Sequence, residues 1–366
     1  MSDDPLLPDY SGACISNVVP ALLEPSVDPV PWIPAEVQEA ARVVLLVLDG
    51  LGWDQLVERA SLALTLCSMK GGPISSVVPT TTATALTSIA TGLTPGQHGV
   101  IGYRIAVEGD VLNVLRWTTP SGDARDTIPP TEFQKAAAFG AQHPPIVTRA
   151  EFTGGGFSGA HLDGTRIHGY RCLSTLVTEV KRLTNANEPF VYAYYDGIDK
   201  VAHEYGLGEF YDAELLDCDR LVGEILDVLP SETALVITAD HGQVHTGDAL
   251  YELPASVTEH VAMQSGEGRF RWLHARPGRA KALYEATLEA FHDLAWVRTK
   301  EQVIDEGWFG PTITSVAASR LGDVALVATG VHAFIDPADT GPYRLIGRHG
   351  SLTSAEMRVP LLAAVR

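Results

Sequence analysis

The chain has 366 residues, of which 45% are hydrophobic, and this is enough to bury the core of a large α/β domain. Its 45 acidic and 26 basic residues give a formal net charge of −19, which disfavours long polyanions such as DNA and anionic membrane surfaces as partners. Small phosphorylated substrates remain compatible with this charge, because bound divalent cations would reverse the local field.

The N-terminal stretch is acidic and lacks the basic and apolar regions of a secretory signal. No apolar run approaches the roughly 20 residues that a membrane-spanning helix needs. The cysteines show neither metal-type spacing nor a dense disulfide framework, which favours isolated thiols in a reducing compartment. We therefore expect a cytoplasmic protein, and nothing in the sequence indicates its oligomeric state. The cysteines are Cys14, Cys67, Cys172 and Cys218.

Strand and helix patterns alternate along the chain. Continuous apolar runs predict strands that are covered on both faces, and apolar residues at helical spacing predict helices between them. This alternation predicts an α/β fold with a doubly wound, mostly parallel sheet and helices on both faces. The strand candidates start at Val43 and recur at 74–78, 190–195, 234–238 and 324–328, and the helix candidates are 83–90, 174–183 and 211–228.

Three segments depart from this alternation. Residues 1–40 are rich in proline and have no strong period, so we expect a segment packed over the surface. Residues 104–170 and 245–345 contain short alternating pieces and turns, with one helical stretch at 280–293. We expect both to form cap or rim insertions over the sheet edge, so that residues 1–366 make a single domain.

A carboxylate follows the first predicted strand. Asp49 ends the run VVLLVLD and precedes Gly50, so its side chain can point beyond the sheet edge, where open α/β sheets build their sites. Taken alone, a plain Asp-Gly turn explains the pattern equally well.

A threonine-rich turn follows the second predicted strand, in VPTTTATALTSIATG. A threonine here would lie at a helix N-terminus, where free N–H groups and the helix dipole stabilise an oxyanion. It can be a nucleophile or simply an N-cap. Spacing alone does not rank the four candidates, which are Thr80, Thr81, Thr82 and Thr84.

Carboxylates and imidazoles also follow two later strands. Asp199 and His203 are four residues apart, which places both on one face of a helix, where they can chelate one metal. Asp240 and His241 follow the strand at 234–238 and precede a glycine, so a turn could bring both to one ion. His349 is flanked by glycine, and a lone histidine is usually structural.

Together these residues amount to three carboxylates, three imidazoles and one hydroxyl. That set is what two neighbouring divalent metals and a nucleophile require. Each signal is weak alone, and their joint occurrence after predicted strands indicates a two-metal hydrolase.

The order of these motifs resembles the alkaline phosphatase superfamily, and within it the nucleotide pyrophosphatase/phosphodiesterase branch. DG, PTTT, D-x-x-x-H, DHG and a late HG follow one another from Asp49 to His349. The resemblance implies two Zn²⁺ ions, or other divalent metals, on a doubly wound sheet, and hydrolysis through a phosphothreonine. It also implies that Thr82 is the nucleophile, because it follows a P-T-x pattern and precedes the helix-closing Gly92 by ten residues.

The ligand sets are likewise implied by the resemblance. One metal would be held by Asp49, Thr82, Asp240 and His241, and the other by Asp199, His203 and His349.

The sequence departs from this branch at the position expected to contact the phosphoryl oxygen. Tyr103 stands where the branch has asparagine, so it becomes the candidate substrate-binding residue. Diesters and nucleotide-type pyrophosphates are the expected substrates, and a phosphomonoesterase is the main alternative. A phosphotransferase resembling the cofactor-independent phosphoglycerate mutases and a non-catalytic metal- or nucleotide-binding protein are further alternatives.

A basic and aromatic segment, EGRFRWLHAR, lies in the second insertion. Its side chains could hold the base or a second phosphate of a nucleotide. An amphipathic strand of a cap is the better explanation, because arginine and tryptophan often serve packing. The residues in question are Arg269, Arg271 and Trp272.

Overall fold

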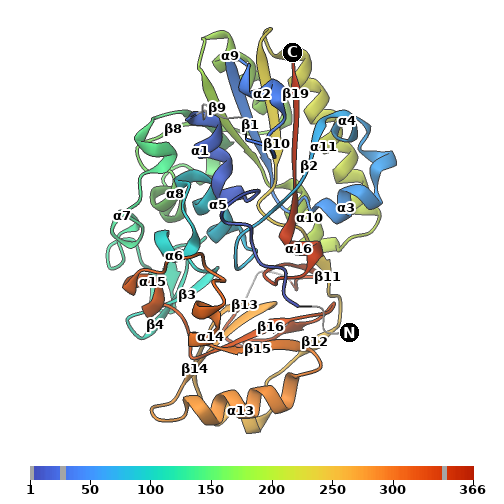
Figure 1. Cartoon of the computed structure of the whole chain (residues 1–366). Coiled ribbons are helices and arrows are strands. Elements are labelled where there is room, and N and C mark those ends of the chain that lie inside the picture. The colour runs from blue at the N-terminus through green and yellow to red at the C-terminus, as the bar shows by residue number, and fades with distance from the viewer. Residues whose placement is uncertain (1–3, 25–29, 340–343) are drawn as a thin grey trace.

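The computed structural model describes residues 4–24, 30–339 and 344–366 (Figure 1). Within these residues the central sheet has seven strands, and β19 alone runs antiparallel to the others. The predicted α/β fold with a mostly parallel sheet is confirmed. In spatial order the strands are β2 (Lys70–Ser75), β19 (Arg358–Val365), β10 (Thr233–Thr238), β1 (Arg42–Leu48), β9 (Phe190–Tyr195), β7 (Pro145–Arg149) and β8 (Arg166–Tyr170).

Helices cover both faces of this sheet (Figure 1). On one face α9 (Leu173–Asn185) and α4 (Leu64–Ser68) contact α11 (Glu209–Val228), and on the other α5 (Thr82–Thr91) contacts α1 (Val18–Leu23). Burial on both faces explains why β1 is an uninterrupted apolar run. The other helices around the sheet are η1 (Ile15–Asn17), α2 (Ala35–Gln38), α3 (Trp53–Glu58), η2 (Ala60–Leu62), α6 (Pro95–His98), α7 (Pro130–Phe133), η3 (Ala138–Ala141), η4 (Ala150–Phe152), α8 (Gly156–His161), α10 (Gly197–Tyr205) and α16 (Ser354–Met357).

A second sheet lies beyond one end of the central sheet, at the bottom of Figure 1. Its strands pair antiparallel, and α13 (Ala280–Phe291) packs on it around a separate apolar cluster that includes Leu273 and Leu326. It is built from the predicted insertion at 245–345, of which residues 340–343 lie outside the described part. The run at 324–328 forms a strand here. The strands are β13 (Val261–Glu267), β14 (Phe270–Ala275), β16 (Val324–Ala328) and β15 (Ala295–Thr299), and β11 (Val244–His245), β12 (Leu250–Tyr251), α12 (Ala255–Thr258), α14 (Lys300–Asp305), α15 (Ser315–Ser319), β17 (Ala333–Phe334) and β18 (Gly347–Arg348) surround them.

Contrary to the sequence prediction, residues 104–170 do not form a cap insertion throughout. Their first part forms a small antiparallel sheet, but β7 and β8 pair in parallel with the central sheet and extend it. These strands are short, and β8 is the partly exposed edge strand, so the apolar runs that identify buried strands are weak here. The small sheet consists of β3 (Arg104–Val107), β4 (Asp110–Asn113), β5 (Thr118–Thr119) and β6 (Gly122–Asp123).

The N-terminal segment, residues 1–40, is more than a surface layer in its described part, which excludes residues 1–3 and 25–29. Cys14, Ile15 and Val18 are fully buried, and η1 and α1 pack against α5. The segment therefore contributes to the core that holds α5 in place.

Three adjacent strands end at the edge of the sheet where the candidate ligands lie. β10, β1 and β9 are neighbours, and residues that follow their carboxyl ends include Asp240, Asp49 and Asp199. Parallel strands bring such residues together at one edge. No helix in the described part is long and apolar enough to cross a membrane, and all four cysteines are free.

Candidate metal centre

Two buried carboxylates and an imidazole converge where β1 and β10 end. The Nε2 atom of His241 lies 3.5 Å from Oδ1 of Asp49 and 3.3 Å from Oδ2 of Asp240. All three side chains are almost completely buried, with exposures of 0–2%. These three groups can converge on one cation.

In each of these two carboxylates, one oxygen accepts hydrogen bonds from the protein and the other accepts none. Asp49 Oδ2 accepts a hydrogen bond from the Tyr194 hydroxyl, and Asp240 Oδ1 accepts from the backbone N–H groups of Gly50 (3.0 Å) and His241 (2.9 Å). Asp49 Oδ1 and Asp240 Oδ2 are buried without any hydrogen-bond partner in the described structure. Buried carboxylate oxygens without a partner are costly, so they call for a cation.

A second group lies beside the first. The Nε2 atom of His203 is 3.2 Å from Oδ1 of Asp199, and Nε2 of His349 is 3.7 Å from the same oxygen. The two Nε2 atoms are 3.3 Å apart. The rings of His349 and His241 stack with centroids 3.6 Å apart, so the two groups adjoin.

All three histidines are oriented in the same way. Nδ1 of His203, His241 and His349 lies 2.8–3.0 Å from a backbone carbonyl oxygen. A carbonyl oxygen can only accept, so Nδ1 carries the proton and the lone pair is on Nε2. This is the arrangement by which metal-binding histidines are usually fixed.

The electrostatics of the centre also favour bound cations. Burial, reinforced by Asp240 and Asp199, raises the pKa of the Asp49 carboxyl well above its usual range. Burial likewise raises the pKa of Asp240. Burial and the neighbouring histidines lower the pKa of His349 well below its usual range. The charged form of these carboxyl groups is therefore unfavourable unless positive charge lies beside it, and bound divalent cations would supply that charge.

Thr82 is the threonine whose hydroxyl faces this centre. It is the first residue of α5, and its Oγ1 lies 3.2 Å from Nε2 of His241. By contrast, the Thr80 hydroxyl donates to the Ser351 carbonyl (2.7 Å), and the Thr84 hydroxyl is buried without a partner in the described structure. α5 ends at Gly92, whose φ of 69° is the left-handed conformation that glycine favours.

Two supporting residues escaped the sequence analysis. The Tyr194 hydroxyl holds Asp49, and Nε2 of Gln243 donates to Oδ1 of Asp199 (2.5 Å). The sequence signal that could have identified them is their position close to candidate ligands, because Tyr194 is in the strand before Asp199 and Gln243 follows the DHG turn. Their role depends on contacts between strands, which a single sequence does not display.

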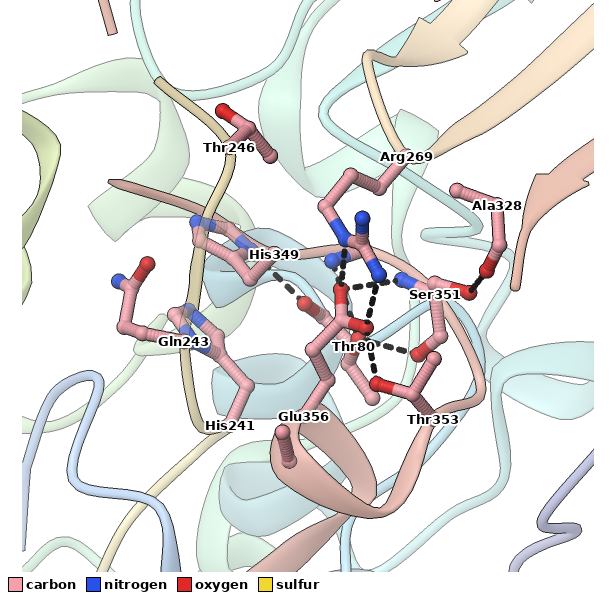
Figure 2. A network of polar contacts seen from close by, with 12 residues as sticks. Thr80, His241, Gln243, Thr246, Arg269, Ala328, His349, Ser351, Thr353 and Glu356 are labelled. Carbon is pink, nitrogen blue, oxygen red and sulfur yellow. Dashed lines mark hydrogen bonds and ion pairs between the residues drawn. The ribbon is translucent and has the colours of Figure 1, made fainter. Parts of the chain in front are cut away.

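The loop that carries His349 is tied to the second sheet by a buried ion pair (Figure 2). Both side chains of the pair Arg269–Glu356 are fully buried, and their two hydrogen bonds measure 2.7 and 2.8 Å. Glu356 also accepts from the backbone N–H of Ser351 (2.9 Å), two residues after His349. The carbonyl oxygen of Thr80 meets Nδ1 of His349 from the other side.

Arg269 and its neighbours on β14 are therefore part of the packing. Arg269, Arg271 and Trp272 are 0–2% exposed. Arg269 also donates to the carbonyl oxygens of Gly330 and His332. Their burial and hydrogen bonds agree with the cap-strand explanation.

We expect Arg269→Met to destabilise the protein strongly. The substitution leaves the Glu356 carboxylate buried without its charged partner, which costs about 3–5 kcal/mol of unfolding free energy. Arg298→Met in β15 of the same sheet is the matched control, because the pair of Arg298 with Glu306 is partly exposed and worth about 1 kcal/mol or less. Urea unfolding monitored by circular dichroism measures both. Equal, small losses in the two variants would contradict the structural role of the buried pair.

A pocket of about 290 Å³ opens beside the metal centre. Asp49, Thr82 and Asp199 line one part of it, and Phe157 and His161 of α8 line another. Tyr103 is not among the described residues that line this pocket, and its hydroxyl accepts a hydrogen bond from the Asn113 amide (2.7 Å). A role for Tyr103 in binding substrate stays a prediction.

A family profile and one curated relative match this chain. The profile of the family described as type I phosphodiesterase / nucleotide pyrophosphatase matches residues 43–352. GPI ethanolamine phosphate transferase 3 of Eremothecium gossypii is 34% identical over 97 residues, which are 25% of this chain and only 9% of that protein.

Solved structures show the same fold. Murine ectonucleotide pyrophosphatase/phosphodiesterase 5 superposes with a TM-score of 0.67 at 16% identity, over 87% of each chain. An inactive form of that protein is known in complex with AMP. Phosphonoacetate hydrolase of Sinorhizobium meliloti, in complex with phosphonoacetate, superposes with a TM-score of 0.65 at 18% identity, over 89% of this chain and 90% of the other.

Proposed function

Because the chain belongs to the type I phosphodiesterase / nucleotide pyrophosphatase family, we propose that it is a two-zinc phosphodiesterase that acts through a phosphothreonine at Thr82. The observation that carries this proposal is the convergence of metal-ligand atoms beside the Thr82 hydroxyl. Two carboxylate oxygens without a partner and three histidine Nε2 atoms surround one small region.

The donor set fits the proposed metals. Imidazole nitrogens and carboxylate oxygens are ligands that zinc prefers, although other divalent metals also accept them. One ion would be held by Asp49, Asp240 and His241 together with Thr82, and the other by Asp199, His203 and His349. When bound, two such ions supply Lewis-acid activation of the hydroxyl and neutralise phosphoryl charge.

The protein supplies the nucleophile and its surroundings. Thr82 Oγ1 loses its proton to solvent and forms a bond to phosphorus while the bond from phosphorus to the leaving oxygen breaks, and the leaving oxygen takes up a proton. Water then attacks phosphorus, the bond to Oγ1 breaks, and the threonine hydroxyl regains a proton. The first amide groups of α5 have no acceptor within the helix, so together with the helix dipole they favour negative charge beside Thr82.

The pocket beside Thr82 supports a small substrate with an apolar or aromatic ester group. Leu86, Phe152 and Phe157 lie in its wall, and the substrate's non-reacting group can pack against them. A phosphate ester of a nucleoside fits this description, and the AMP complex of the murine relative is in keeping with it.

A phosphomonoesterase remains the second candidate, because Tyr103 replaces the asparagine expected of the phosphodiesterase branch. Burial, with Asp339 nearby, raises the pKa of the Tyr103 phenol, so the hydroxyl stays protonated at neutral pH and can donate. A non-catalytic binding protein is disfavoured, since the candidate nucleophile Thr82 lies beside the candidate metal ligands.

Diesters should be cleaved faster than monoesters by the zinc-loaded protein. We expect at least about a tenfold higher kcat/KM for bis(4-nitrophenyl) phosphate than for 4-nitrophenyl phosphate, because the pocket can accommodate a second ester group. Steady-state release of 4-nitrophenol measures both. A monoester preference of similar size would replace the proposal with the phosphomonoesterase alternative.

The same substrate pair tests Tyr103. If its hydroxyl donates to the phosphoryl oxygen, Tyr103→Phe should lower kcat/KM for the diester by about 10- to 100-fold, whereas Tyr103→Asn, which keeps a donor, should retain more activity. Asn113→Ala is the control, because it removes the hydrogen bond that the Tyr103 hydroxyl accepts but leaves the hydroxyl itself in place. If Tyr103→Phe has the same kcat/KM as the wild type, the Tyr103 hydroxyl has no part in catalysis.

A further inference from the structure

The part of the pocket around α8 has mostly apolar walls with few free polar groups. Leu86 and Leu162 are buried, and Phe152 and Phe157 add two aromatic rings. The Ser158 hydroxyl is already used, because it donates to the carbonyl oxygen of Phe152 (2.8 Å).

Two further polar groups of the pocket, Asp196 and Tyr194, are also paired. Asp196 accepts from Arg149 (2.5 Å) and Lys200 (2.6 Å), and Tyr194 donates to Asp49. A bound group therefore finds few polar partners here, and each unpaired one has a large effect on what can bind.

His161 provides such a partner. The side chain is 5% exposed and lines the pocket, and its ring stacks on Phe157 with centroids 3.9 Å apart and planes 16° apart. Nδ1 lies 2.7 Å from the carbonyl oxygen of Phe157 in the same helix. None of the described residues forms a hydrogen bond with Nε2.

These contacts fix what His161 can do. A carbonyl oxygen only accepts, so Nδ1 carries the ring proton. Burial lowers the pKa of His161 to about 4, so the ring is neutral near pH 7. Nε2 is then solely an acceptor, whereas the pocket hydroxyls of Thr148 and Tyr192 can donate as well as accept.

We propose that His161 is a specificity-determining residue, whose Nε2 accepts a hydrogen bond from an N–H or O–H group on the non-reacting ester group of the substrate. The favoured group is an apolar or aromatic body that carries a neutral donor, such as an aryl amine or an amino-substituted heterocycle. This inference rests on the proposed function. A substrate without the donor would leave a buried acceptor unpaired, which lowers its reactivity relative to its donor-bearing counterpart.

Two matched diesters test the inference on the zinc-loaded protein. 4-Nitrophenyl 4-aminobenzyl phosphate and 4-nitrophenyl 4-methylbenzyl phosphate share a leaving group and have nearly the same size, but only the first carries a donor. We expect the wild type to prefer the amino ester by about tenfold in kcat/KM. His161→Phe keeps a planar ring beside Phe157 and should abolish that preference, with little change for the methyl ester.

Two further variants sharpen the test. Ser158→Ala changes the same helix and pocket but removes a hydroxyl that is already paired, so it should keep the preference. His161→Gln retains an acceptor oxygen and should keep part of it. Circular dichroism verifies that each variant is folded. If His161→Phe is unfolded, His161→Leu takes its place. A preference that survives loss of the ring, or a wild type that treats both esters alike, overturns the inference.

A binding measurement separates this inference from the proposed function. Calorimetry of zinc-loaded wild-type protein with 4-aminobenzyl phosphonate and 4-methylbenzyl phosphonate requires no hydrolysis. Tighter binding of the amino compound that is lost in His161→Phe would support the role of His161, even if neither diester is cleaved. Failure to cleave either diester would refute the phosphodiesterase proposal alone. Equal binding of the two phosphonates overturns the role of His161, whatever the hydrolysis rates.

Discussion

Thr82→Ala is expected to reduce kcat by on the order of a thousandfold or more while the protein stays folded. Removal of the nucleophile eliminates the covalent route and leaves only what the remaining groups contribute to direct attack by water. Thr82 is the first residue of α5, and alanine is a good helix former, so we expect little change in thermal stability. Release of 4-nitrophenol from the diester measures kcat, and circular dichroism measures the melting temperature.

Neighbouring threonines provide the controls for this prediction. Thr84 is buried in the same helix and its hydroxyl has no partner in the described structure, so Thr84→Ala should be close to wild type in activity. Thr82→Ser keeps a hydroxyl and should keep part of the activity, with a phosphoserine detectable by mass spectrometry after acid quench. An inactive Thr84→Ala or Thr81→Ala beside an active Thr82→Ala would show that another threonine is the nucleophile.

The parts of the fold that could be predicted from the sequence are those buried on both faces. β1, β9 and β10 are continuous apolar runs, and α11 has strong helical periodicity, so each was recognised by its pattern. β19 was missed, because its short apolar run contains Pro360 and follows α16 without a clear turn signal. Its reversed direction depends on how the chain returns between β2 and β10, which periodicity does not encode.

The candidate ligands could be predicted because each follows a strand, and neighbouring parallel strands end at one edge. The choice among the threonines needed the family pattern. The structure adds an independent reason, because among the described residues only the Thr82 hydroxyl, of these four, contacts His241. Tyr194, Gln243 and His161 could not be identified in this way. Each acts through a partner that is distant in sequence or through a cavity, and neither leaves a periodic signal.

Activity and thermal stability are both expected to depend on bound zinc. Purified protein reconstituted with zinc should hold about two equivalents per chain, and a chelator should abolish activity until zinc is returned. Removal of the ions also leaves the carboxylates of Asp49 and Asp240 buried beside each other without compensating charge. Since the ions bind the native state, chelation should lower the melting temperature by several degrees, on the order expected from mass action. Elemental analysis and thermal unfolding measure the two effects.

Substitutions should separate the two ions. His203 contacts Asp199 and His349 but is not among the groups around Asp49 and Asp240, so His203→Ala should lower the stoichiometry from about two to about one. His292→Ala is the matched control, because His292 is exposed at the end of α13 and its loss should leave the zinc content unchanged.

If the reconstituted wild type binds no more than one equivalent of zinc, the two-metal proposal is wrong. If it binds two and His203→Ala still binds two, the second ion is not held by the group of Asp199, His203 and His349, because loss of one of three protein ligands from such a site should weaken binding by at least about tenfold.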